Sequence, residues 1–115
     1  PLETQKLIYE VSKNINYSKI AMHLHDTYGQ ALANIYASMQ MGVASFDTSV
    51  GGLGGCPYAK GASGNVATED VIYMLNGMNI KSGINLKKVL TASKFIYKIL
   101  NRNIVSKTAS AMISK

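Results

Sequence analysis

Two histidines, His23 and His25, are separated by one residue in a segment that alternates between apolar and polar side chains. In a β-strand, residues two apart project from the same face at a spacing of roughly 7 Å. Two imidazoles on one face can bind a single divalent metal ion. They can equally form a hydrogen-bonded pair at the end of a strand, so a metal site and a structural pair both remain open.

The single cysteine, Cys56, lies in a glycine-rich segment, GGLGGCPYAKGASGN, which spans residues 51–65. Six of the ten glycines fall between residues 51 and 64, and a loop of this length in a small domain is usually functional or disordered. Glycine freedom would let the loop bring a thiol to a substrate and withdraw it. Cys56 is therefore a candidate acid/base group or nucleophile, and the alternative is a small buried hydrophobic residue.

Two further polar residues are placed to take part in such a site. Asn65 ends the glycine-rich segment, where its carbonyl oxygen could bind a metal, although a turn or cap is the commoner use of asparagine there. Asp47 shares an alternating segment with Ser45 and Ser49. It could line the interior of a barrel or accept hydrogen bonds from backbone amides.

Helices and strands alternate around these residues. The expected elements are a helix over 2–13, a strand over 18–25, a helix capped by Asp26 or Thr27 and ended by Gly42, a strand over 43–49, a helix from Thr68, a helix capped by Asn85 and a weaker helix around 105–112. The expected inward residues of the helices are Leu7, Ile8, Val11; Leu32, Ile35, Tyr36, Met39; Val71, Ile72, Leu75, Met78; Leu86, Val89, Leu90, Phe95 or Ile96, Leu100; and Val105, Ala109, Met112.

The order of these elements, with about 25 residues between strand starts, is typical of parallel βα units. In parallel α/β folds, functional sites gather at the carboxyl ends of the strands, which is where His25 is expected. Two parallel strands cannot form a sheet by themselves that is buried on both faces. The sequence therefore predicts an α/β fold that is incomplete as it stands, a single partial domain over residues 1–115.

Composition narrows the class of protein. Hydrophobic residues make up 47% and charged residues 16% of the 115 residues, which is typical of a globular chain and not of a disordered one. One cysteine excludes an intrachain disulfide, and no apolar run approaches the length of a membrane span. The net charge of +6 is uneven, because all six acids lie in the first 70 residues and eight of the twelve bases follow them. Since only one base is an arginine, a solvated basic surface is favoured over a nucleic-acid interface.

Two segments together resemble a known family. Residues 23–34, HLHDTYGQALAN, and residues 52–65, GLGGCPYAKGASGN, closely resemble the two signatures of the 3-hydroxy-3-methylglutaryl-CoA lyases. Residues 67–70, ATED, and 100–102, LNR, are also similar to that family. The histidine pair alone is shared with a wider superfamily of metal-dependent aldolases and Claisen-condensing enzymes, whereas the glycine-cysteine loop is much more specific to the lyases.

The resemblance implies the C-terminal portion of a (β/α)8 TIM barrel, with its last two strands and closing helices. It implies cleavage of 3-hydroxy-3-methylglutaryl-CoA to acetyl-CoA and acetoacetate, in leucine catabolism and ketone-body formation. By position, His23, His25 and Asn65 are implied metal ligands for Mg²⁺ or Mn²⁺, and Cys56 and His23 are implied catalytic residues. A CoA thioester is the implied substrate and a homodimer the implied full-length assembly. The implied compartment is the mitochondrial matrix in a eukaryote and the cytoplasm in a bacterium.

One family segment has no counterpart in these 115 residues. Family members carry an Arg-Asp-Gly first strand whose aspartate binds the metal and whose arginine is catalytic, and we expect five to six further βα units upstream of Pro1. Two alternatives stay open beside the lyase. One is a related isopropylmalate- or homocitrate-synthase-like enzyme, and the other is an inactive truncated remnant that acts only as an interaction partner.

Overall fold

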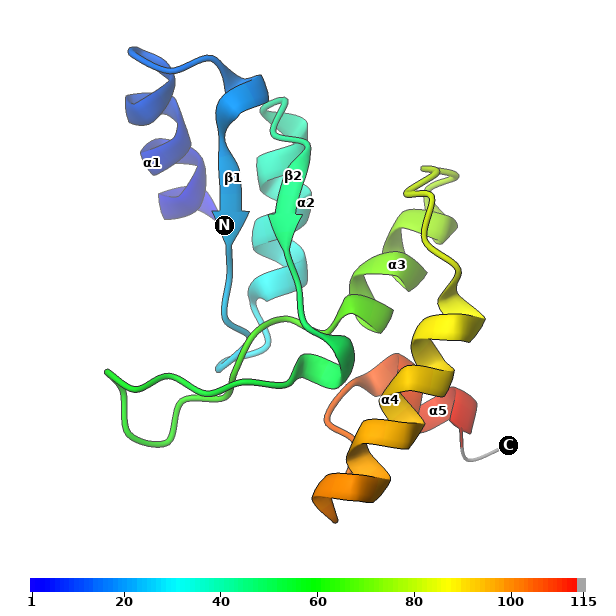
Figure 1. The fold of residues 1–115 in the computed structure, drawn as a ribbon. Helices are drawn as coiled ribbons and strands as arrows, with labels where there is room; N and C mark the ends of the chain where they lie inside the picture. The colour runs from blue at the N-terminus through cyan, green and yellow to red at the C-terminus, as the bar shows by residue number, and fades with distance from the viewer. Residues whose placement is uncertain (114–115) are drawn as a thin grey trace.

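The computed structural model describes residues 1–113, so the last two residues of the predicted 1–115 domain lie outside the described part. Its elements, in chain order, are α1 (Leu2–Ser12), a 3-10 turn (Tyr17–Lys19), β1 (Ala21–His23), α2 (Ala31–Gln40), β2 (Ser45–Asp47), a second 3-10 turn (Val50–Gly52), α3 (Thr68–Gly77), α4 (Leu86–Leu100) and α5 (Lys107–Ile113). The predicted order of helices and strands is confirmed (Figure 1).

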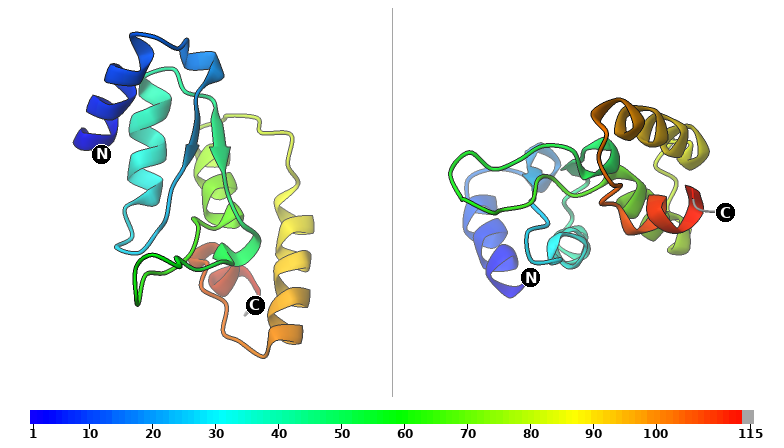
Figure 2. Two further views of the ribbon diagram at one scale, coloured as in Figure 1. Left: turned by 60° about the vertical axis from the view of Figure 1, so that its left-hand side comes forward. Right: turned by 90° about the horizontal axis from the view of Figure 1, so that it is seen from below.

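The two strands pair in parallel, as their spacing along the chain predicts. Ala21 lies opposite Ser45, and His23 lies opposite Asp47. Helix α2 connects the strands, and α1 packs against α2 (Figure 1). Helices α3, α4 and α5 contact one another in a second group beyond β2, and Figure 2 shows this separation from two further directions.

A small hydrophobic core joins α2, the sheet and the start of α3. Its buried centre comprises Ala31, Ile35, Val66 and Val71. Phe46 packs against this centre from the middle of β2 and Leu24 from just after β1, together with side chains of α2 and α3. Burial of this apolar surface holds the strand ends in place, and these ends carry the polar candidate residues.

Several predicted boundaries are wrong. The predicted strand 18–25 begins with a 3-10 turn, because the Asn16 side chain accepts a hydrogen bond from the Ser18 amide, and extended pairing covers only Ala21–His23. The strand predicted over 43–49 pairs only at Ser45–Asp47. Without a neighbour on their outer edges, the described strands have few ladder bonds to extend them.

The helix caps were partly predicted. Asp26 accepts a hydrogen bond from the Ala31 amide at 2.9 Å, so it caps α2 from a distance, and Asn85 caps α4 as expected. Helix α3 begins at Thr68 as predicted, with Ala67 in the N-cap position and the Thr68 hydroxyl bonded to that of Thr48.

The inward faces also need correction. The following residues predicted to point inward are exposed: Leu7, Tyr36, Leu100, Val105 and Met112. Of the alternatives Phe95 and Ile96, Ile96 is the partly buried one. On α4 the buried positions are Ser93 and Tyr97. The helix packs on the second 3-10 turn, on α3 and on α5.

No helix within residues 1–113 has the length and hydropathy of a membrane span.

Candidate active site

The histidine pair lies where β1 ends. The Nε2 atoms of His23 and His25 are 3.2 Å apart, and the rings meet edge to face with centroids 5.2 Å apart. This separation suits two nitrogen ligands of one metal ion and also suits a direct hydrogen bond. The strand alternation that puts both rings on one face is the predicted one, with Met22 and Leu24 turned to the opposite side.

Asp47 lies beside His23 on the neighbouring strand. Its Oδ2 is 3.3 Å from Nδ1 of His23, and the two residues are register partners across the parallel pair. When Nδ1 carries the ring proton and donates a hydrogen bond to a carboxylate, Nε2 is unprotonated and its lone pair can bind a ligand. Asp47 is thus a side-chain partner of His23. The sequence had suggested a residue lining a barrel interior or an acceptor for backbone amides, and neither alternative predicted this contact.

Asn65 lies next to His25, because the two residues form an isolated antiparallel bridge. The Asn65 side-chain amide donates to the Leu53 carbonyl at 3.1 Å, while its Oδ1 is buried and has no hydrogen-bond partner within the described residues. An unpartnered buried oxygen is costly unless something supplies it with a partner. The structure thus brings together all three residues predicted as metal ligands.

The donor atoms fit part of a divalent-ion shell. Two imidazole nitrogens and one amide oxygen are chemically suitable ligands, and the unpartnered Asn65 Oδ1 has a lone pair available for such an ion. Within residues 1–113, no cluster of three or more His, Cys, Asp or Glu side chains is arranged to hold a metal. Because Mg²⁺ favours several oxygen ligands, further oxygens must complete its shell.

The glycine-rich loop passes across the carboxyl ends of both strands (Figure 1). Cys56 and His25 line one cavity of about 570 Å³, with Thr27, Gln30 and Lys60 among its other walls. Cys56 is partly exposed and its thiol is free. The tertiary structure therefore brings the predicted thiol and one predicted metal ligand to the same cavity, although 31 positions separate them in the sequence.

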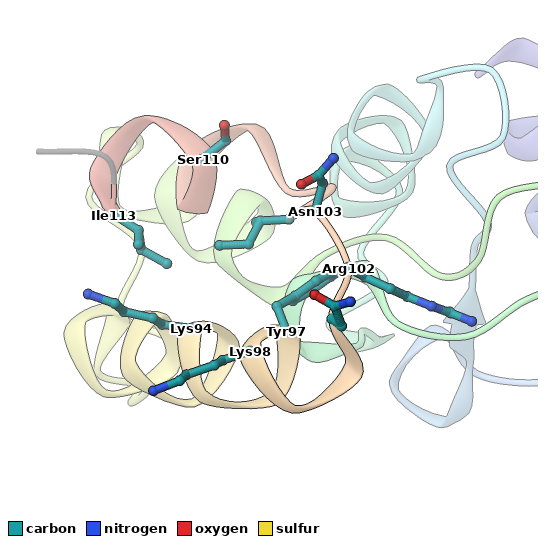
Figure 3. A pocket seen from close by; sticks show the side chains of 9 residues that line it. Lys94, Tyr97, Lys98, Arg102, Asn103, Ser110 and Ile113 are labelled. Carbon is teal, nitrogen blue, oxygen red and sulfur yellow. The ribbon is translucent and has the colours of Figure 1, made fainter.

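A second cavity, of about 590 Å³, lies between α4 and α5 (Figure 3). Lys94 and Lys98, one helical turn apart, and Arg102 are among its lining residues. The basic excess of the last 45 residues thus contributes three lining residues to this cavity, and their charged ends point in different directions (Figure 3). Sequence reasoning identified the charge but not the cavity, because that depends on how α5 folds back on α4.

Comparison with known proteins places this geometry in a family. The HMGL-like family model matches residues 1–96, most of the chain. The chain belongs to the HMGL-like family.

Relatives of this HMGL-like chain have a consistent name. The chain is 55% identical over 111 residues to the human protein named 3-hydroxy-3-methylglutaryl-CoA lyase, cytoplasmic, covering 96% of this chain and 30% of that protein. Other relatives of this kind are named as mitochondrial. The recognition of the lyase family from residues 23–34 and 52–65 is confirmed.

Solved structures agree with the fold. A hydroxymethylglutaryl-CoA lyase from Pseudomonas aeruginosa superposes with a TM-score of 0.93 at 50% identity, covering 97% of this chain and 37% of that one. An HMG-CoA lyase from Acinetobacter baumannii, solved with coenzyme A and 3-methylmalate, has a TM-score of 0.91 at 34% identity, covering 96% and 36%. The predicted fold class is confirmed, and the chain spans about a third of the length of the relatives it matches.

Proposed function

We propose that this chain forms the C-terminal part of a barrel that cleaves 3-hydroxy-3-methylglutaryl-CoA to acetyl-CoA and acetoacetate. The observation that carries the proposal is the meeting of Cys56 with His25 in one cavity, with the His23 ring beside that of His25 and with Asn65 paired to His25 through the backbone. The shared lyase name of relatives at 50–55% identity supports the same reaction.

The reaction breaks the carbon–carbon bond between the carbinol carbon and the carbon next to the thioester. The hydroxyl loses its proton and becomes the ketone of acetoacetate, while the bonding pair passes to the thioester fragment as an enolate. That fragment takes up one proton to become acetyl-CoA. No oxidant or reductant is required, because one proton moves in net from oxygen to carbon.

The chain's own residues divide this work. His23, His25 and Asn65 would hold the ion, and Asp47 keeps His23 oriented through Nδ1. A bound Mg²⁺ or Mn²⁺ supplies positive charge that stabilises the alkoxide and enolate oxygens. Cys56 delivers the proton to the enolate carbon, and loop residues on its C-terminal side form one wall of the same cavity.

The CoA part of the substrate carries phosphates, which need cations. Lys94, Lys98 and Arg102 around the second cavity are suitable partners for these groups. We propose that this surface takes the anionic part of the thioester. The homodimer and the compartment, mitochondrial matrix or bacterial cytoplasm, remain predictions of the family resemblance.

The test uses the complete protein with 3-hydroxy-3-methylglutaryl-CoA and Mg²⁺ or Mn²⁺. We expect acetoacetate and acetyl-CoA in equal amounts, and Cys56→Ala should lower kcat by about 10² to 10⁴. Ser63→Ala in the same exposed loop is the control and should leave kcat unchanged. In the same assay, Lys98→Ala should raise KM and Lys87→Ala, on the same helix but outside the cavity, should not.

Absence of acetoacetate would contradict the lyase proposal. Condensation of acetyl-CoA with a 2-oxo acid by the same protein would instead support the isopropylmalate- or homocitrate-synthase-like alternative.

A further inference from the structure

Buried side chains from two helices hold the backbone of Gly51, the first residue of the glycine-rich loop. The Gly51 amide donates to both carboxylate oxygens of Glu69, at 2.9 and 2.8 Å. The Tyr97 hydroxyl donates to the Gly51 carbonyl at 2.8 Å. Glu69 is 0% exposed and Tyr97 is 4% exposed, so neither bond competes with bulk water. We name these three residues the Gly51 anchor.

The anchor requires glycine on steric grounds. Gly51 has φ of +65°, a conformation that side chains disfavour. A Cβ at this position would lie 2.3 Å from Cε2 of Tyr97. The tyrosine ring therefore packs directly on the loop backbone, and the hydroxyl can reach the carbonyl only because no side chain intervenes.

Beyond the anchor, the two ends of the loop are fixed to each other. A Cβ on Gly64 would lie 2.0 Å from the Gly54 carbonyl oxygen, so the two backbone segments touch there. Asn65 bonds to Leu53 across the same contact. By contrast, Gly55 and Gly61 have open space around them and Tyr58 is 96% exposed. The loop thus has a fixed base and a free outer part, and Cys56 lies just past the base.

We propose that Tyr97 and Glu69 are positioning residues for Cys56, acting through Gly51. Removing the Tyr97 hydroxyl leaves the buried Gly51 carbonyl without a hydrogen-bond donor. This favours conformations in which the Gly51 backbone rotates and its carbonyl accepts a bond from another donor. Gly51, Leu53 and Gly54 together form the fixed base from which the chain runs to Cys56. A Gly51 that is no longer held loosens this base and lets the thiol of Cys56 move. The inference deepens the proposed function, on which it rests for the catalytic role of that thiol.

Tyr97→Phe in the complete protein tests the proposal, because it removes one oxygen and keeps the ring. Tyr73→Phe, which loses an exposed hydroxyl on α3, is the matched control. We expect hydrogen exchange over residues 50–54 to accelerate roughly five- to tenfold in Tyr97→Phe, as the loss of one hydrogen bond implies. Alkylation of Cys56, followed on its own peptide by mass spectrometry, should accelerate by a similar factor, and the control should match wild type in both.

Two results would overturn the proposal. One is unchanged exchange and alkylation in a folded Tyr97→Phe protein, and the other is an equal acceleration in α2, which would make Tyr97 a general stabiliser. Wild-type protein gives a further check that needs no variant: amide exchange at Gly51 as fast as at residues 58–61 would rule out the anchor.

Turnover separates this inference from the proposed function. If wild type cleaves the thioester, Tyr97→Phe should lower kcat several-fold with KM nearly unchanged, whereas a general loss of structure would lower the active fraction and the melting temperature together. If wild type shows no lyase activity, the proposed function fails. Exchange and alkylation still decide whether the Gly51 anchor positions Cys56.

Discussion

At the scale of single residues, Asp47 shows how one carboxylate prepares an imidazole. Its Oδ2 lies 3.3 Å from Nδ1 of His23, although both side chains are more than half exposed. The contact is therefore weak as an ion pair. Its value lies in orientation, because a histidine whose Nδ1 proton is held presents a free Nε2.

Asp47→Asn should weaken Mn²⁺ binding to the complete protein by about 10-fold or more, as loss of such an outer partner typically does. Electron paramagnetic resonance of free Mn²⁺ during a titration measures the affinity without requiring turnover. Ser45→Ala, two residues earlier on β2 and also exposed, is the control. Equal affinity in Asp47→Asn and wild type would show that His23 does not depend on this contact.

At the scale of elements, α5 is a seven-residue helix that depends on a side chain from α3. Asp70 accepts hydrogen bonds from the Ser106 hydroxyl and the Thr108 amide, each at 2.8 Å, and from the Lys107 amide at 3.3 Å. These bonds cap the start of α5, because they give a hydrogen-bond acceptor to amides that have no partner within the helix. Through them, α3 fixes the helix that forms one wall of the basic cavity.

Asp70→Ala should destabilise the protein by about 1–2 kcal/mol, since it removes the cap of α5. Urea unfolding measures the change, and hydrogen exchange should show it concentrated in residues 107–113. Glu3→Ala is the control, because its pair with Lys6 is exposed and contributes under about 0.5 kcal/mol. A loss no larger than that of Glu3→Ala would contradict the capping role.

At the scale of the whole molecule, the described sheet has two strands whose outer edges are unpaired. Unpaired strand edges favour association with other chains. Within residues 1–113, no group of three or more His, Cys, Asp or Glu side chains is arranged to complete a metal site. The 115-residue chain alone should therefore lack lyase turnover and self-associate as its concentration rises.

Sedimentation velocity across a range of concentrations and an acetoacetate assay with Mg²⁺ measure these two properties. Cys56→Ala is the control for the assay. Turnover that Cys56→Ala abolishes would rule out the inactive-remnant alternative, and a monomer at every concentration would contradict the reasoning about strand edges.

The order of the elements, the parallel pairing and the lyase family followed from the sequence alone. Hydrophobic periodicity and spacing are local properties, so α2, α3 and α4 and the facing of His23 and His25 were predictable. Strand ends and inward faces were predicted less well, as Tyr36 and Leu100 show, because burial depends on which elements lie opposite.

The sequence by itself therefore determined which residues have suitable chemistry: His23, His25, Cys56 and Asn65. Only the tertiary structure decided which side chains contact His23 and which hold the backbone at the start of the loop that carries Cys56. Asp47 reaches His23 through strand register, and Glu69 and Tyr97 reach Gly51 from helices 18 and 46 positions further along. Such contacts have no local pattern, because they arise when separate elements pack on one core and leave a backbone group within reach of a distant side chain.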